Sequence, residues 1–275
     1  MLEDPNAQAR QAAAFGLGVL GGPASARRLE EQLALEEARG THESAAVVDE
    51  LTRALGHLQE ASARASLVRR LQRLTKSTAQ RSELNTLACA LWKVRHPELL
   101  PAVRSSLSHL PVPDPNALHG LLVLLEKRPE ELATWVRDPG VPVKQKSGVL
   151  TVLTEELPVS LRPSLPALIS EAHERLAVAD SQQSDSTYYG ESLLGMLLRH
   201  REPLLSMLPP DASSELRQIA RSLVVAPHGS LRAATMLQLV GLPEDAALLE
   251  AHRPEEPILA KVFDDAAQAL RAREH

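Results

Sequence analysis

The sequence predicts an all-α fold, a right-handed α-solenoid of about six or seven stacked helical hairpins that is irregular in its middle. The first observation behind this prediction is composition, because the 275 residues include 49 leucines and 38 alanines but only three isoleucines and six aromatic residues. Leucine and alanine are strong helix formers, whereas strands favour β-branched and aromatic residues. The second observation is that apolar residues recur at helical spacing. The third is a two-helix unit that repeats about every 35–40 residues.

Residues 4–35 form the clearest copy of this unit. Asp4-Pro5 predicts an N-cap followed by proline at the first helical position, where its missing N–H costs nothing. Gly16 and Gly18 would weaken an isolated helix, so they indicate the close approach of a neighbouring helix. The turn Gly21-Gly22-Pro23 ends the first helix, and the apolar stripe after it predicts the second.

The same unit recurs along the N-terminal part of the chain. A match to Gly16–Leu20 lies 38 residues later at Ala54–Leu58, and a third copy lies a further 36 residues on at Ala90–Val94. In this alignment Gly16 corresponds to Ala54 and Ala90, while Trp92 replaces the glycine expected in the third unit. We therefore assign regular repeats to residues 4–110.

The remaining residues are predicted as less regular repeats of one continuous array over 1–275. Residues 111–210 are irregular, with a helix break at Asp138-Pro139-Gly140. The polar run 181–187 lacks helical periodicity, so residues 181–192 are predicted as a surface loop. Residues 211–273 are predicted to resume regular repeats and to end in a closing helix, whose acidic start and basic end suit the helix dipole.

The opening unit resembles a HEAT repeat of the short bacterial type, which is also found in phycobilisome-lyase-like proteins. The resemblance rests on the Asp4-Pro5 start, on Arg10, on the Ala12-Ala13 pair and on the ending Leu17-Gly18-Val19-Leu20-Gly21. In that family these positions cap, pack and turn. The resemblance implies a solenoid that binds other macromolecules, and it names no partner.

Charge and cysteine content narrow the class of protein. The formal net charge is −5, which makes nucleic acid an improbable partner for the chain as a whole. A single cysteine, Cys89, permits no internal disulfide and predicts a reducing compartment, taken as the cytoplasm. The sequence contains neither a signal-peptide pattern nor an apolar run long enough to span a membrane.

The strongest functional candidate is a basic segment, residues 61–105, with nine basic and only two acidic residues. Second helices of such repeats usually line the concave face, so this segment predicts a basic ridge that binds an acidic partner protein. An alternative is that acidic residues of the flanking repeats neutralise it. The candidate partner-binding arginines are Arg64, Arg69, Arg70, Arg73 and Arg104.

Two adjacent tyrosines form the second candidate. Tyr188 and Tyr189 end the polar run, and tyrosine is enriched at binding hot spots on loops. The alternative is that they pack on the adjacent unit at the start of a helix. Trp92 and Trp135 are predicted as core fillers, and Cys89 as buried and inert.

No motif predicts catalysis, a cofactor or a metal site. The chain lacks a Gly-x-Ser-x-Gly elbow and a glycine-rich phosphate loop. HEAT-like hydroxylases bind iron through four His-Glu pairs, but here only His42-Glu43 and His173-Glu174 occur. We therefore expect a non-catalytic scaffold or adaptor that binds another protein on its concave face, with oligomeric state left open. The alternatives are a nucleic-acid-binding solenoid that uses residues 61–105, and a HEAT-like lyase or metal-dependent enzyme.

Overall fold

The structure is a computed structural model that describes residues 1–75, 81–110, 116–178, 183–226 and 230–274. Every regular element within these ranges is helical, which confirms the all-α prediction. Contacts divide the chain into two compact units, unit 1 (Met1–Glu126) and unit 2 (Lys127–His275). The right-handed solenoid geometry and the single array over 1–275 stay predictions.

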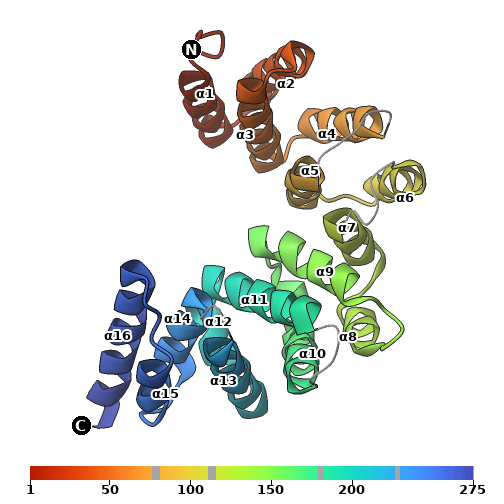
Figure 1. Cartoon of the computed structure of the whole chain (residues 1–275). Coiled ribbons are helices and arrows are strands. Elements are labelled where there is room, and N and C mark those ends of the chain that lie inside the picture. Colours follow the sequence, from red (N-terminus) through yellow and green to blue (C-terminus); the bar gives the residue numbers. More distant parts are fainter. Residues whose placement is uncertain (76–80, 111–115, 179–182, 227–229, 275) are drawn as a thin grey trace. The chain divides into compact units, whose positions relative to one another are not determined.

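Unit 1 packs its helices in two rows (Figure 1). In the first row α1 contacts α3, α3 contacts α5 and α5 contacts α7. In the second row α2 contacts α4, and α4 contacts α6. This alternation is the arrangement expected of stacked helical hairpins. The helices are α1 (Ala7–Leu20), α2 (Pro23–Arg39), α3 (His42–Leu58), α4 (Ala61–Leu74), α5 (Arg81–Lys93), α6 (Leu99–His109) and α7 (Asn116–Glu126).

The helix ends in unit 1 follow capping chemistry. The prediction that Asp4 caps α1 is wrong, because Asn6 is the N-cap and its side chain accepts a hydrogen bond from the Gln8 N–H. Asp4 supports that cap by accepting a 2.9 Å hydrogen bond from the Asn6 N–H. Pro23 occupies the first turn of α2, as predicted, and Gly40 ends that helix in the left-handed conformation.

Close contacts between small residues join the first-row helices. A Cβ placed on Gly18 of α1 would lie 3.0 Å from the Cβ of Ala54 on α3. A Cβ on Gly56 of α3 would lie 2.8 Å from the Cα of Ala90 on α5. Both contacts join the same two aligned repeat positions, so the packing supports the alignment made from sequence. Gly16 behaves differently, since a Cβ there would meet nothing within 4 Å.

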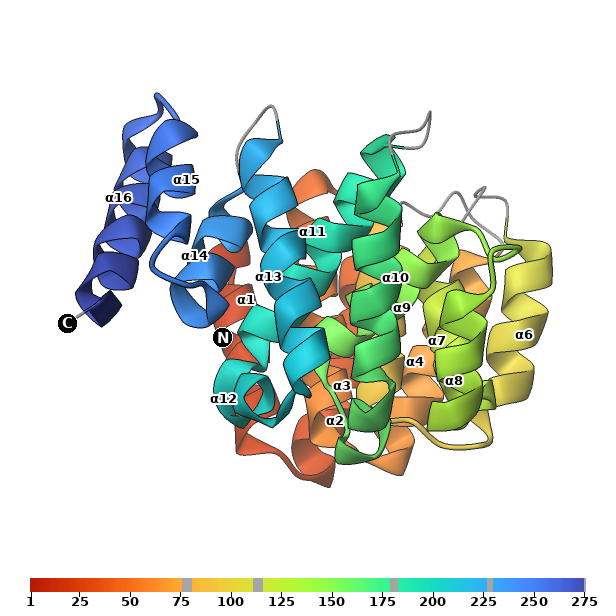
Figure 2. The same cartoon turned by 90° about the horizontal axis from the view of Figure 1, so that it is seen from below.

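Unit 2 also packs in two rows. One row runs α9, α11, α14 and α16, and the other runs α8, α10, α13 and α15. Figure 2 shows α10 and α13 of the second row side by side. The helices are α8 (Pro129–Arg137), α9 (Val143–Glu155), α10 (Leu165–Ala177), α11 (Gln183–Arg199), α12 (Arg201–Leu204), α13 (Pro210–Val225), α14 (Leu231–Val240), α15 (Asp245–Ala251) and α16 (Pro257–Arg271).

Unit 2 confirms some local predictions and contradicts one. The break at Asp138-Pro139-Gly140 separates α8 from α9, and the closing helix is present as α16. The predicted surface loop over 181–192 is wrong for residues 183–192, which belong to the long helix α11. Residues 181 and 182 lie outside the described residues. The helical structure of this segment therefore contradicts the prediction that Tyr188 and Tyr189 lie on a surface loop.

We predict that Gly56→Ala lowers the free energy of unfolding by about 1–3 kcal/mol, because the added Cβ would collide with the α5 backbone. Gly16→Ala is the matched control. It should be neutral or stabilising by up to about 1 kcal/mol, since alanine favours helix and the added methyl meets no neighbour. Urea unfolding followed by circular dichroism measures both changes. Equal effects of the two substitutions would contradict the close contact.

Candidate functional site

The predicted basic ridge is neutralised by acids of neighbouring helices. Arg69 of α4 donates a 2.7 Å hydrogen bond to Glu30 of α2. Arg73, one turn further along α4, donates a 2.5 Å hydrogen bond to Glu37 of α2. The acids that the alternative interpretation placed in the flanking repeats are therefore in contact with these arginines.

Arg70 is the centre of this network. Its side chain is only 1 % exposed, and it forms ion pairs with Glu37 and with Glu83 of α5. A buried guanidinium requires such partners, because an unpaired charge in the interior is costly. Arg70 is therefore unavailable to a partner protein, which corrects its assignment as a contact residue.

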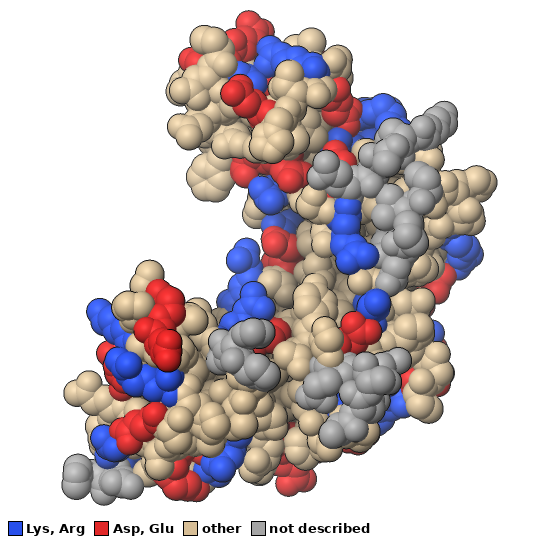
Figure 3. All heavy atoms as spheres, viewed as in Figure 1, with Lys and Arg blue, Asp and Glu red and all other residues tan. Residues whose placement is uncertain are grey.

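The other two candidate arginines are also paired. Arg64 lies 3.7 Å from Glu98, and Arg104 on α6 donates a 2.5 Å hydrogen bond to Glu126 on α7. Figure 3 shows basic and acidic side chains intermixed on the face of unit 1 in view. Duplex binding would require basic residues with no acids between them, and these arginines do not form such a face.

A small cavity of about 360 Å³ adjoins Arg70 and Arg73. Its wall also includes the carboxylates of Glu36, Glu37 and Glu83. Because these three acids outnumber the two arginines, the lining is not electropositive and does not suit an anion.

The two tyrosines point to different environments. Tyr188 is exposed on α11, whereas Tyr189 is completely buried, so its predicted contact with a partner is wrong. The Tyr189 hydroxyl donates a 3.5 Å hydrogen bond to the Leu168 carbonyl of α10. Burial raises the pKa of Tyr189, which keeps the phenol neutral in the core.

Of the other three residues predicted to be buried, one is buried and two are partly exposed. Trp92 is buried, as predicted, and the Arg95 guanidinium lies 4.8 Å from its ring centroid. Trp135 is only partly buried, and Cys89 is partly exposed rather than buried.

Sequence reasoning missed a buried carboxylate in unit 1, Glu36. It lies 2.7 Å from Arg10 Nε, and it accepts hydrogen bonds from Gln32 at 2.8 Å and Arg39 at 2.6 Å. Burial alone would raise the pKa of Glu36, but hydrogen bonds from Arg10, Gln32 and Ser44 outweigh burial and lower it. Arg10, which carried part of the HEAT resemblance, therefore joins α1 to α2.

Unit 2 contains two similar charge clusters. The Glu171 carboxylate of α10 forms ion pairs with Lys146 of α9 and with Arg175 of α10, each at 2.5 Å. Burial lowers the pKa of Lys146. Asp245 of α15 is completely buried and pairs with Arg217 and Arg221 of α13. Burial opposes ionisation of Asp245 and by itself would raise its pKa. Hydrogen bonds from Arg217, from the Leu242 N–H and from Arg221 outweigh burial, so the pKa of Asp245 is lowered. Each of these clusters joins two helices of unit 2, α9 to α10 and α13 to α15.

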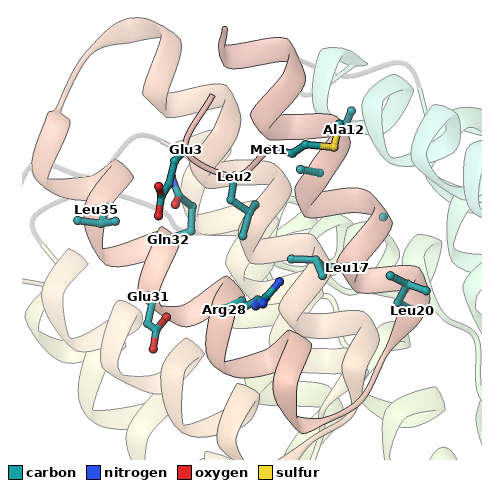
Figure 4. A pocket seen from close by; sticks show the side chains of 12 residues that line it. Met1, Leu2, Glu3, Ala12, Leu17, Leu20, Arg28, Glu31, Gln32 and Leu35 are labelled. Carbon is teal, nitrogen blue, oxygen red and sulfur yellow. The ribbon is translucent and has the colours of Figure 1, made fainter. Parts of the chain in front are cut away.

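Unit 1 also has an open groove between α1 and α2, with a volume of about 750 Å³. Figure 4 shows Leu2 pointing into the space between the two helices, with Leu17 and Leu20 on one side and Leu35 on the other. We call this surface the α1–α2 groove. Its lining residues are Met1, Leu2, Glu3, Ala12, Ala13, Gly16, Leu17, Leu20, Arg28, Glu31, Gln32 and Leu35.

Large apolar side chains on α1 and α2 are exposed in and beside this groove. The exposed fractions are 79 % for Leu20 and 51 % for Leu35, with Phe15 at 62 % and Val19 at 71 % on the adjoining surface of α1. Three exposed charged side chains, Glu3, Arg28 and Glu31, also line the groove. The groove therefore offers apolar area together with exposed charged groups.

The described ranges contain neither a metal-binding cluster nor a membrane-spanning helix. No group of three or more histidine, cysteine, aspartate or glutamate residues there could hold a metal ion. Nor is any helix in those ranges sufficiently long and apolar to span a membrane. No protein-family model, curated protein or solved structure matches the chain.

We predict that Arg70→Ala lowers the free energy of unfolding by about 1.5–3 kcal/mol, because it removes a buried guanidinium together with its ion pairs to Glu37 and Glu83. Arg69→Ala is the control on the same helix and should cost less than about 1 kcal/mol, since its ion pair is exposed. Urea titration measures both values. A fully stable Arg70→Ala variant would contradict the structural role of Arg70.

We predict that the stabilisation from Glu36 is lost in acid. Because the folded-state pKa of Glu36 is lowered, its ionised form stabilises the fold above the unfolded-state value near 4.5, and this contribution disappears as pH falls through the folded-state pKa. Glu36→Gln should therefore be less stable than wild type at pH 7, and the difference should narrow below about pH 4. Unfolding titrations at several pH values test this; a constant difference would refute it.

Proposed function

We propose that this chain is a non-catalytic protein-binding scaffold of HEAT-like helical hairpins that holds a helical segment of another protein in the α1–α2 groove. The single observation that supports this proposal is the exposed apolar surface of that groove, with Leu20 79 % exposed. We also propose that it acts in a reducing compartment such as the cytoplasm, because its one cysteine can form no internal disulfide.

The size and chemistry of the groove favour a helix as the bound element. Contiguous exposed apolar patches mark interaction sites, and an amphipathic helix commonly inserts its apolar face into such a groove. Leu17 and Leu20 on α1, with Leu35 on α2, provide two apolar walls. The exposed charged groups Arg28 and Glu31 add orientation, since charges at the edge of an apolar site select opposite charges on the partner.

This proposal moves the binding site away from the arginines of residues 61–105. Those side chains already pair with Glu30, Glu37, Glu83, Glu98 and Glu126, so an acidic partner would have to compete with bonds within the protein. The nucleic-acid alternative loses its main support for the same reason. Neither it nor an enzymatic role has a specific observation in its favour.

We predict that Leu20→Asp and Leu35→Asp each abolish capture of the partner protein, because a charge in the groove removes its apolar character. The matched control is Leu242→Asp in unit 2, where the leucine is 46 % exposed and comparable with Leu35. The three variants and wild type are immobilised, exposed to extract from the native cell, and compared by quantitative mass spectrometry.

The informative result is a protein that wild type and Leu242→Asp retain but both groove variants lose. Because the substituted side chains are exposed, melting temperatures should change little, and this is checked by circular dichroism. Equal retention by all four proteins would overturn the assignment of the groove as the binding site.

A further inference from the structure

We propose that the α1–α2 groove receives a helical hairpin of the partner protein, which stacks on α1 and α2 in the way that these helices stack on α3 and α4. One partner helix presents glycine or alanine to Gly16, and the other presents a basic residue to Glu31. This inference rests on the proposed function and specifies the chemistry of the bound segment.

The first-row contacts identify the position that receives a neighbouring helix. Gly18 of α1 packs on Ala54 of α3, and Gly56 of α3 packs on Ala90 of α5. Ala54 and Ala90 are therefore receiving positions, and the alignment places Gly16 at the same position of α1. Gly16 lines the groove, and a Cβ there would meet nothing within 4 Å. The receiving position of α1 is thus present and uncovered.

The second-row contacts lead to the same surface. Three receiving residues of α4 (Arg69, Arg70 and Arg73) pair with the acids Glu30 and Glu37 of α2. The residues 38 positions earlier are Glu31, Gln32 and Leu35, and all three line the groove. Both helices therefore turn their receiving positions toward the groove, which makes its bound element a pair of helices rather than an extended peptide.

The side chains at these positions define the complementary face. At this position α4 has Arg69, which pairs with an acid of α2. The corresponding residue of α2 is Glu31, an exposed carboxylate, so the partner residue opposite it is expected to be basic. Gln32 already donates to Glu36, and Leu35 supplies apolar area. The partner's second helix therefore carries lysine or arginine opposite Glu31 and an apolar residue opposite Leu35.

The polar face of α16 argues against head-to-tail binding of a second copy. The exposed residues of α16 include Lys261, Asp264, Asp265 and Gln268. Such a face would bury charges against Leu17 and Leu20 without supplying the small residue that Gly16 accommodates. Two copies that pair through their α1–α2 grooves are instead an outcome of the test.

The test adds a hairpin to the full chain as a probe. A second copy of residues 4–41 is placed directly before Asp4, so that the added unit has the 38-residue spacing of the first two repeats. One version keeps the native sequence, and the other carries Glu30→Lys and Glu37→Lys in the added copy. Amide hydrogen exchange in the native α1 reports whether the added hairpin covers the groove.

We expect the lysine version to slow exchange at the ends of native α1 at least tenfold relative to the unextended chain. The native-sequence version should protect about two- to fivefold less, because its acids meet Glu31. Gly16→Leu in the native unit should abolish protection by blocking close approach, whereas Gly140→Leu, outside unit 1, should leave it unchanged.

Three results would overturn the inference. Absence of protection with both versions would exclude a stacked hairpin, and equal protection would remove the assignment of a basic residue opposite Glu31. A concentration-dependent dimer of the unextended chain, detected by sedimentation and broken by Leu20→Asp, would show that a second copy occupies the groove. Absence of protection leaves the proposed function intact if the capture experiment still depends on Leu20 and Leu35, so the two failures are distinguishable.

Discussion

The close approach of successive first-row helices is the constraint on which the rest of unit 1 depends. At Gly18 and Gly56 the backbone lies so near the next helix that a Cβ would fall within about 3 Å of it. Glycine destabilises an isolated helix by up to about 1 kcal/mol, so tertiary packing must offset that cost. The short separation allows a core of leucine and alanine to fill the space between rows. It also brings α2 and α4 close enough for Glu30 and Glu37 to reach the arginines of α4.

Charge is balanced between neighbouring helices rather than along the sequence. The basic segment 61–105 follows an N-terminal segment rich in acids, and the two cancel where α2 meets α4. In each unit a buried carboxylate then connects two helices, as Glu36 does with Arg10 and Asp245 with Arg217. Such buried pairs add little net stability relative to apolar residues, but breaking one is expensive. They therefore make one packing arrangement of the helices much better than its alternatives.

The sequence alone predicted the helical class, the hairpin unit and the alignment of Gly18 with Gly56. All three follow from composition and from the repeat period, and both can be read directly along the chain. It did not reveal which acids meet which arginines. A signal was present, since the pairs Glu30–Arg69 and Glu37–Arg73 are separated by 39 and 36 residues, close to the repeat length.

The error over residues 183–192 has a similar cause. Serine, aspartate and threonine obscured the apolar positions of α11, although Tyr189, Leu193 and Leu197 follow helical spacing and are all buried. The candidate groove was not predictable from single positions. It depends on which face of α1 is covered, because Leu17 aligns with Leu55 of α3 and Leu91 of α5, and both of those leucines are buried.

The exposed face of α1 is the observation that favours the proposed binding role of the groove. The exposed surface of α16 carries Lys261, Asp264 and Asp265 beside one large apolar residue, Ile258, whereas α1 exposes three, Phe15, Val19 and Leu20. Burying one such side chain yields about 1.5–3 kcal/mol. Covering the groove with a matching helix would therefore bury apolar side chains that are exposed to water in unit 1, and this burial would favour binding. The arginines of α4 are already paired with acids, so covering them would gain no comparable free energy.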